Sequence, residues 1–269
     1  MHTFYDTHAH LDYPDFADEL PQVIERAQAA GIQKIVSIGT DLESSRAAIG
    51  LADRFPNVFA VVGWHPTNVT GAPPDIRPEF RSLANHPKVV ALGETGLDYY
   101  RLPGGDAEHP TPENERYQAR QAVLFEQHLE LAAELGLNCV IHERAAMEDT
   151  LKIMERYAGR VRGVFHCFSA GTVSLRRILD MNSIVSFTGI VTFKNAQSVR
   201  DSLAATPMGS FMLETDCPYL APVPYRGKRC EPAYVKEISE LVATVKGRQL
   251  EELSAETCRT AETFFRKLK

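Results

Sequence analysis

The chain has 269 residues, of which 44% are hydrophobic and 24% are charged, and its net charge is −6. This composition suits a globular protein with a sizeable core, whereas the negative charge argues against a protein that coats duplex DNA through a basic surface. An enzyme that acts on nucleic acid is still compatible with this charge, because metal ions can supply positive charge where a phosphate is held. We expect residues 1–269 to form a single domain, since barrels of about 250 residues commonly do so.

Hydropathy and cysteine usage predict a cytoplasmic protein without a membrane span. No apolar run approaches the roughly 18 residues that a transmembrane helix needs, and the sequence enters strand-like residues without an apolar signal segment. The five cysteines are scattered and include no Cys-x-x-Cys pair. This pattern argues against a disulfide framework or a zinc ribbon and favours a reducing compartment. No stretch of the sequence indicates an obligate protein partner.

Short β-branched runs alternate with segments of helical period along the whole chain. The predicted strands cover residues 3–6, 34–38, 58–62, 89–93, 138–141, 162–165, 183–186 and 210–213. The predicted helices cover residues 17–30, 42–54, 114–135, 147–157, 173–180, 196–204, 232–246 and 250–267. Eight parallel strands with crossover helices predict an α/β fold of the (β/α)8 TIM barrel type. A doubly wound open sheet is the alternative, although no Gly-x-Gly-x-x-Gly loop follows the first strand.

Histidines and carboxylates gather at the predicted carboxyl ends of the strands, where barrel enzymes place their chemistry. The first strand leads into His8 and His10, which share one face because side chains two residues apart in a strand point the same way. Later strands lead into further residues of the same kinds. The six candidate metal ligands are His8, His10, Glu94, His142, His166 and Asp216.

Four imidazoles and two carboxylates exceed what one tetrahedral ion needs, so they predict two divalent metal ions. We assign the two histidines of the first strand and Asp216 to one ion. The histidines after the fifth and sixth strands are assigned to the other ion, and Glu94 is expected to bridge the pair. Mixed imidazole and carboxylate ligands favour Zn, Mn, Fe or Co over Ca. Mg is also compatible, although nitrogen ligands are unlike its usual oxygen shell.

A pair of metal ions predicts hydrolysis, because it activates water and neutralises charge on the oxygens of a phosphodiester. Asp216 is the candidate general base. Arg144 could bind a phosphate through its forked guanidinium group, and His65 could donate to the phosphate or the leaving oxygen. A structural role beside Trp64 is the alternative for His65. Among neighbouring carboxylates, Asp6 is expected to fix the tautomer of a ligand histidine, and Glu214 could also support the ligands.

Substrate-binding residues are expected at the rim. Lys194, Arg226 and Lys228 follow the seventh and eighth strands, where barrels often bind phosphate, and an ordinary solvated loop is the alternative interpretation. Tyr99 and Tyr100 follow Glu94, where a base could stack. The residues 102–112, rich in Pro and Gly, predict an inserted loop over one face.

These motifs resemble those of the TatD family of metal-dependent deoxyribonucleases, a branch of the amidohydrolase-like barrels, along essentially the whole chain. The likeness lies in the runs DTHAHLD, GETGLDYY, FHCFS, SFTGIVTF, LETDCP and PYRGKR, in the family's order. The resemblance implies a divalent-metal-dependent hydrolase with the same six ligands. It also implies 3′ to 5′ exonuclease activity on single-stranded DNA, or on RNA, so that the expected partner is a nucleic-acid substrate.

The sequence departs from the family pattern at a few positions near the rim. Ala145 stands where the family often has Asp, Ala170 where Gly is usual, and Cys230 where Asn often precedes Glu-Pro. The loop over residues 101–117 also looks longer than is typical. No departure removes a ligand, so we expect the chemistry to be kept and the substrate preference to be open to change.

Two other functions fit the same residues. A metal-dependent deacylase or amidohydrolase, for example one that deacylates aminoacyl-tRNA, would use the same ions, because activated water attacks carbon and phosphorus alike. An inactive barrel that serves as a binding scaffold is the third interpretation, and the complete ligand set argues against it.

Overall fold

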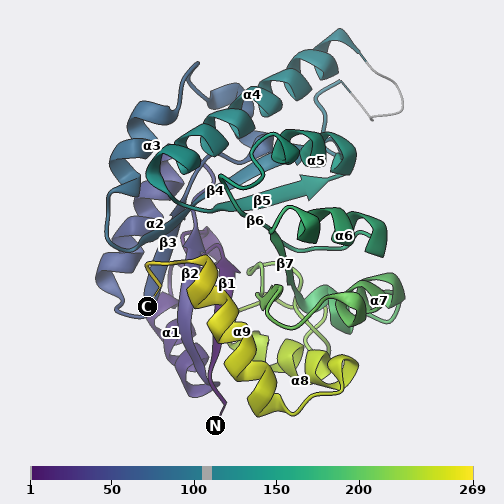
Figure 1. The fold of residues 1–269 in the computed structure, drawn as a ribbon. Coiled ribbons are helices and arrows are strands. Elements are labelled where there is room, and N and C mark those ends of the chain that lie inside the picture. The colour runs from purple at the N-terminus through teal and green to yellow at the C-terminus, as the bar shows by residue number, and fades with distance from the viewer. Residues whose placement is uncertain (1, 105–110, 269) are drawn as a thin grey trace.

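The computed structural model describes residues 2–104 and 111–268. One parallel sheet of eight strands, in the order of the chain, lies inside a layer of helices (Figure 1). The strands are β1 (Phe4–Ala9), β2 (Ile32–Ile38), β3 (Val58–Val62), β4 (Val89–Asp98), β5 (Cys139–Arg144), β6 (Gly163–Phe165), β7 (Ile184–Phe187) and β8 (Phe211–Leu213). The helices are α1 (Leu20–Ala29), α2 (Leu42–Arg54), α3 (Arg77–Ala84), α4 (Pro112–Leu135), α5 (Met147–Glu155), α6 (Thr172–Asp180), α7 (Gln197–Ala205), α8 (Val235–Lys246) and α9 (Leu250–Phe264).

The sheet closes where β1 meets the segment that follows β8. Ala9 pairs with Cys217 in a parallel bridge, and the N–H of His10 donates to the carbonyl oxygen of Cys217 at 2.9 Å. The N–H of Asp216 donates to the carbonyl oxygen of His8, also at 2.9 Å. These bonds confirm the predicted single-domain (β/α)8 barrel, and they bring the two ends of the sheet together at its carboxyl edge.

All eight predicted strands are present, but the prediction ended three of them three or more residues too early. β1 continues to Ala9, β4 to Asp98 and β5 to Arg144. Helix α3 was not predicted, because only Phe80 and Ala84 of its eight residues are buried and two prolines precede its start. Residues 105–110 of the predicted inserted loop lie outside the described residues. None of the helices in the described ranges combines the length and the apolar character that crossing a bilayer demands.

The amino end of the barrel is filled by apolar side chains. One residue or more from each of β2 to β8 joins a buried cluster with Phe264, Phe265 and Leu268 at the end of the chain. The carbonyl oxygen of Phe264 accepts a hydrogen bond from the side-chain amide of Asn138, which directly precedes β5. The end of α9 therefore plugs the amino end and leaves the carboxyl end free for the candidate site.

Candidate metal centre

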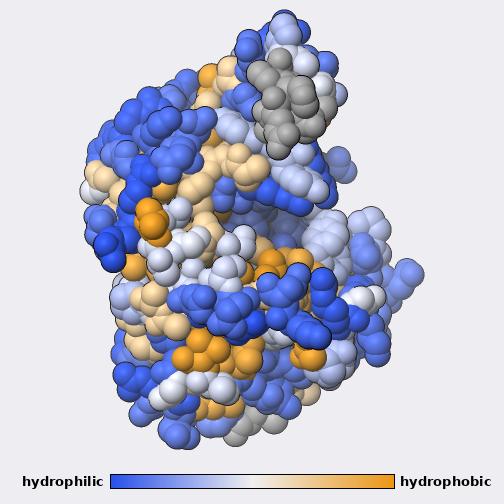
Figure 2. Space-filling view, turned by 90° about the vertical axis from the view of Figure 1, so that its right-hand side faces the viewer, coloured by the Kyte–Doolittle hydropathy of each residue, from blue (hydrophilic) through white to orange (hydrophobic). Residues whose placement is uncertain are grey.

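The carboxyl ends of the strands surround a cavity of about 540 Å³. Figure 2 views the molecule from the side to which β5 points in Figure 1, and it shows a recess bordered by hydrophilic residues. Five of the six candidate ligands line the cavity, namely His10, Glu94, His142, His166 and Asp216. The sixth, His8, is completely buried. The structure thus gathers at one mouth all six residues that the sequence analysis selected.

Two glycines in β4 let the ligands of β4 and β5 approach each other. Gly93 and Gly96 have φ angles of +134° and +139°, which residues with a side chain rarely adopt. A Cβ atom at Gly96 would lie 2.0 Å from the carbonyl oxygen of His142. The absence of a side chain at this position therefore allows β5 to pack closely beside Glu94.

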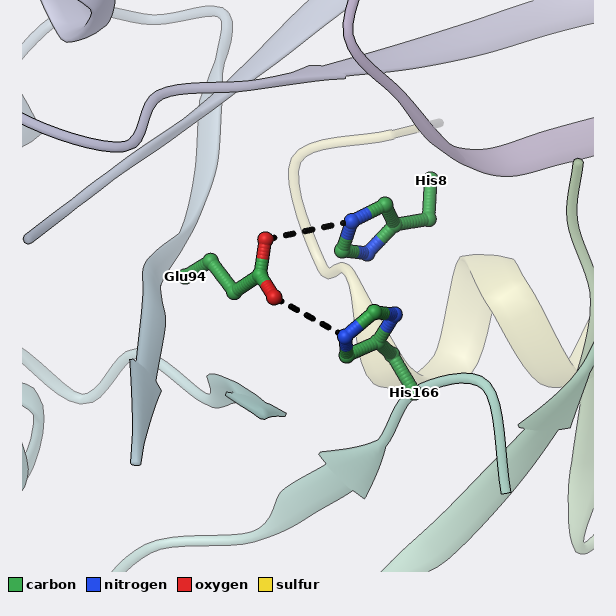
Figure 3. A group of neighbouring side chains, drawn as sticks. All are labelled: His8, Glu94 and His166. Atoms are coloured by element: carbon green, nitrogen blue, oxygen red, sulfur yellow. Dashed lines mark ion pairs between the residues drawn. The ribbon is translucent and has the colours of Figure 1, made fainter. Parts of the chain in front are cut away.

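Glu94 lies at the centre of the cluster and directs its two carboxylate oxygens to different imidazoles. Figure 3 shows the Glu94 carboxylate facing the stacked rings of His8 and His166, which belong to β1 and to the segment after β6. Oε2 lies 3.3 Å from His8 Nε2, and Oε1 lies 2.9 Å from His166 Nε2. Burial would raise the pKa of Glu94, but the nearby histidines lower it well below its usual value. The carboxylate is therefore ionised at neutral pH.

Oε2 of Glu94 belongs to a first group of four possible ligand atoms. The other three are His8 Nε2, His10 Nε2 and Asp216 Oδ1. The distance from His8 Nε2 to Asp216 Oδ1 is 3.6 Å, and that from His10 Nε2 to the same oxygen is 3.4 Å. His10 Nε2 lies 3.8 Å from Glu94 Oε2. Around a tetrahedral ion with ligands at about 2.1 Å, neighbouring donor atoms lie about 3.4 Å apart. These four atoms therefore have the spacing that suits one metal ion.

Oε1 of Glu94 belongs to a second group. His142 Nδ1 lies 2.8 Å from this oxygen and 3.3 Å from His166 Nε2. His65 Nε2 lies 3.3 Å from Glu94 Oε1 and 3.2 Å from His142 Nδ1. Possible metal-binding groups accordingly include His8, Glu94 and His166 together, so that His166 is close to both parts of the cluster.

Buried nitrogen atoms without partners also fit a metal. Neither ring nitrogen of His8 has a hydrogen-bond partner in the described part of the chain, although the ring is inaccessible to solvent. Burial lowers the pKa of His8, so its imidazole is neutral, which is the form that coordinates metal ions. A buried polar atom left without a partner is costly, and a metal ion would remove this cost.

Asp98 is a site residue that the sequence analysis did not select. Its Oδ2 lies 3.1 Å from His142 Nε2, and its Oδ1 accepts the N–H groups of Tyr100 and Arg101. Burial would lower the pKa of His142, but hydrogen bonds to Asp98 and Glu94 raise it. Asp98 accepts the hydrogen on Nε2, so Nδ1, which faces Glu94, is the nitrogen that would bind a metal ion. Extending the predicted strand by five residues would have put Asp98 on the same face as Glu94.

The two supporting carboxylates behave differently. Glu214 accepts the N–H of Cys167 at 2.7 Å, and its Oε1 lies 3.6 Å from His166 Nδ1, which agrees with a supporting role. Asp6 does not contact a ligand ring, contrary to the expectation. It accepts hydrogen bonds from the N–H and the hydroxyl of Thr215 and from the N–H of His8. Asp6 therefore holds β1 against the segment after β8 and does not fix a tautomer.

His65 presents a hydrogen atom to the cluster. The backbone N–H of Thr67 donates to His65 Nδ1 at 3.1 Å, so Nδ1 is an acceptor. Burial lowers the pKa of His65 and keeps the ring neutral, and its one hydrogen then lies on Nε2, which faces Glu94. This nitrogen suits a hydrogen-bond donor better than a metal ligand.

The predicted substrate-binding residues lie at different distances from the cavity. Arg144 lines it, and its guanidinium group lies 3.7 Å from the ring centre of Tyr100. Tyr99 does not line it, because the ring is half-buried and its hydroxyl donates to Asp149 at 3.3 Å. Three further predicted residues also lie outside the cavity lining, namely Lys194, Arg226 and Lys228.

The loop that carries Arg226 and Lys228 is held against α1. The carboxylate of Glu231 accepts hydrogen bonds from Arg26 at 2.7 to 3.1 Å, and Arg229 pairs with Glu19 at 2.7 Å. Arg226 is different, because its guanidinium group lies 3.7 Å from the ring centre of Phe193. In the described ranges, Arg226 and Lys228 form no ion pair, so their charges face the solvent.

A (β/α)8 barrel whose mouth gathers histidines and carboxylates in metal-binding positions belongs to the class of metal-dependent hydrolases, and comparisons with known proteins agree. A family model described as TatD related DNase matches residues 5–266. The uncharacterized metal-dependent hydrolase YabD of Bacillus subtilis is 36% identical, with 97% of this chain and 98% of YabD covered. The chain therefore belongs to the TatD family.

Two further comparisons bear on fold and activity. A protein of Klebsiella pneumoniae named 3′-5′ ssDNA/RNA exonuclease TatD is 30% identical, and the match covers 97% of each chain. The crystal structure of YJJV, a TatD homologue from Escherichia coli, has a TM-score of 0.87 and 26% identity, and 98% of each chain is covered. The likeness thus extends over the whole barrel.

Proposed function

We propose that the chain is a 3′ to 5′ exonuclease that hydrolyses phosphodiester bonds of single-stranded DNA or RNA with two divalent metal ions. The observation that carries this proposal is the division of the Glu94 carboxylate between two groups of imidazole nitrogens. The proposed ligands are His8, His10, Glu94, His142, His166 and Asp216. When bound, such ions lower the pKa of a water molecule and neutralise charge on a phosphodiester. The name of the Klebsiella relative supports the choice of substrate and polarity.

Asp216 is the proposed general base. It lines the cavity, and although burial would raise its pKa, hydrogen bonding to His10 and the charges of nearby histidines lower it. The carboxylate is ionised at neutral pH and can take the proton from the attacking water. A general base must lie within hydrogen-bond reach of that water, and Asp216 lines the cavity in which a metal-bound water would be held.

His65 is proposed to donate its Nε2 hydrogen to a phosphate oxygen or to the leaving oxygen. The acceptor role of Nδ1 toward Thr67 supports this assignment. Replacing His65 with Ala should lower kcat and leave the number of bound metal ions unchanged, as measured by elemental analysis. Loss of an ion in this variant would instead make His65 a ligand.

A positive side chain in the cavity lining supports a polyanionic substrate. Arg144 lines the cavity and forms no ion pair in the described ranges, so its guanidinium group is available to a phosphate. Lys194, Arg226 and Lys228 are proposed to contact phosphates further along the strand. Replacing both Arg226 and Lys228 with Ala should raise KM for an oligonucleotide and barely affect a small phosphoester. An equal loss on both substrates would remove these residues from the binding site.

The activity is tested with single-stranded DNA and RNA labelled at either end, in the presence of Mg²⁺, Mn²⁺ or Zn²⁺. A 3′ to 5′ exonuclease releases a 3′ label at once as a mononucleotide, and it shortens a 5′-labelled strand stepwise. The same preparation is assayed on aminoacyl-tRNA, with Glu94→Ala as the inactive control. Faster hydrolysis of the aminoacyl ester than of DNA and RNA would make the chain a deacylase. Hydrolysis of none of these substrates would contradict the enzyme proposal.

A further inference from the structure

The wall of the cavity nearest Asp216 is aromatic. Tyr13 and Tyr219 line this wall, and the Tyr219 side chain is 55% exposed. The ring of Tyr13 stacks on that of His10, with centroids 4.8 Å apart and planes at 24°. The ring of Tyr219 meets Tyr13 edge-on, with centroids 6.1 Å apart. These rings form a row that runs from a proposed metal ligand to the open mouth.

The exposed ring of Tyr219 contributes little to the fold. In the described part of the chain its hydroxyl has no hydrogen-bond partner, and more than half of its surface faces solvent. Its backbone is nevertheless fixed, because its N–H donates to the carbonyl oxygen of Asp216 at 3.0 Å. The position of the ring relative to the reacting centre is therefore set by the segment that carries Asp216.

The cavity also presents a positive group. Arg144 lines it with its guanidinium group supported by the ring of Tyr100, which is 63% exposed. A nucleotide has an anionic part and a flat apolar part, which match Arg144 and Tyr219 respectively. Stacking of a base on an aromatic ring tolerates any sequence, because every base has a π-face. A base inside a duplex is covered on both faces and a terminal paired base on one, so an unpaired base is the best partner for such stacking.

We propose that Tyr219 is the platform on which a nucleobase next to the scissile phosphate stacks. This inference rests on the proposed nuclease function and specifies its substrate, namely an unpaired end that carries a base at this position. The platform explains preference for single strands without preference for sequence. Tyr13 meets the Tyr219 ring edge-on, and the hydroxyl of Tyr219 has no part in the proposed contact with the base.

The test uses two single-stranded oligonucleotides with identical phosphates. One has ordinary bases throughout, and the other has tetrahydrofuran abasic residues at its two 3′-terminal positions. For the wild-type protein, kcat/KM for the first bond should be about fivefold or more higher with bases than without them. Tyr219→Leu should lose this preference, whereas Tyr219→Phe should keep it, because only the ring is needed. The thermal midpoint of each variant checks the fold.

Tyr100→Leu is the matched control, because it removes an equally exposed ring that supports Arg144. It should change kcat/KM for both oligonucleotides by the same factor and keep their ratio. The proposal is overturned if Tyr219→Leu keeps the wild-type ratio, or if Tyr100→Leu alone abolishes it. If the wild-type protein cleaves neither oligonucleotide, the nuclease function is refuted, and the platform with it.

Discussion

The two ends of the barrel are built from opposite kinds of side chain. At the amino end, Phe264, Phe265 and Leu268 are buried against apolar residues of the strands. At the carboxyl end, buried histidines and carboxylates crowd around Glu94, and some ring nitrogens have no hydrogen-bond partner in the described ranges. Apolar burial stabilises a fold, whereas buried ionisable groups cost stability unless they are paired or bound to metal. The amino end therefore stabilises the fold, whereas the carboxyl end carries the groups that can bind a ligand.

The largest effect is expected at the carboxyl end. Replacing Asp216 with Ala should lower hydrolysis on the order of 1,000-fold or more, because it removes both a proposed ligand and the proposed base. Far-ultraviolet circular dichroism should stay unchanged. Glu130→Ala, which removes an exposed carboxylate on α4, is the control and should change neither quantity. Retained activity in the Asp216 variant would contradict the claim that the carboxyl end of the barrel is the reacting site.

The opposite effect is expected at the amino end. Replacing Phe265 with Ala should lower the free energy of unfolding by about 3 to 5 kcal/mol, because the ring is completely buried in the plug. Urea denaturation measures this loss. The number of bound metal ions per folded chain should stay at the wild-type value. A variant that loses its metal but keeps its stability would show that the two ends are not separate in function.

A smaller effect, on metal affinity, is expected for the second group of ligands, which includes His142. Asp98→Asn should weaken metal binding by about 10- to 100-fold, since the amide no longer fixes the tautomer of His142 as firmly. Calorimetric titration of the metal-free protein measures the affinity. Unchanged affinity would mean that Asp98 does not act through His142.

The smallest effect concerns a histidine that belongs to the fold. His128 accepts the N–H of Trp64 at 2.9 Å, and burial lowers its pKa to about 4. The unfolded chain therefore binds a proton at higher pH than the folded one, so stability is full above about pH 6.5 and falls as the pH drops toward 4. Between pH 7 and 5 this residue should account for a loss of about 2 kcal/mol. His128→Gln should lose correspondingly less over the same range, as measured by urea denaturation.

The repeating pattern of the barrel could be predicted because each strand and helix has its own local signal. The six proposed ligands could be selected because they lie in the carboxyl-terminal half of a strand or shortly after it, where the fold brings them together. The tautomers of His65 and His142 could not be predicted, since they depend on contacts with Thr67 and Asp98 that only the folded chain makes. The aromatic wall was also missed, because Tyr13 and Tyr219 are about 200 residues apart in the sequence and carry no motif that pairs them.

The role expected of Tyr99 illustrates a similar limit. Proximity to Glu94 in the sequence suggested a stacking ring, but Tyr99 follows the end of β4, and its half-buried ring bonds Asp149 outside the cavity lining. The neighbouring Tyr100 is the exposed ring of the pair. Tyr100 does not line the cavity either, so closeness to Glu94 in the sequence did not place either ring at the site.

The most direct test of the central claim is elemental analysis of the purified protein and of its Glu94→Ala variant, after equilibration with the same divalent metal. If Glu94 is shared by two groups of ligands, the wild-type chain should hold two ions and the variant at most one. A wild-type chain that holds no ion, or a variant that still holds two, would contradict the account.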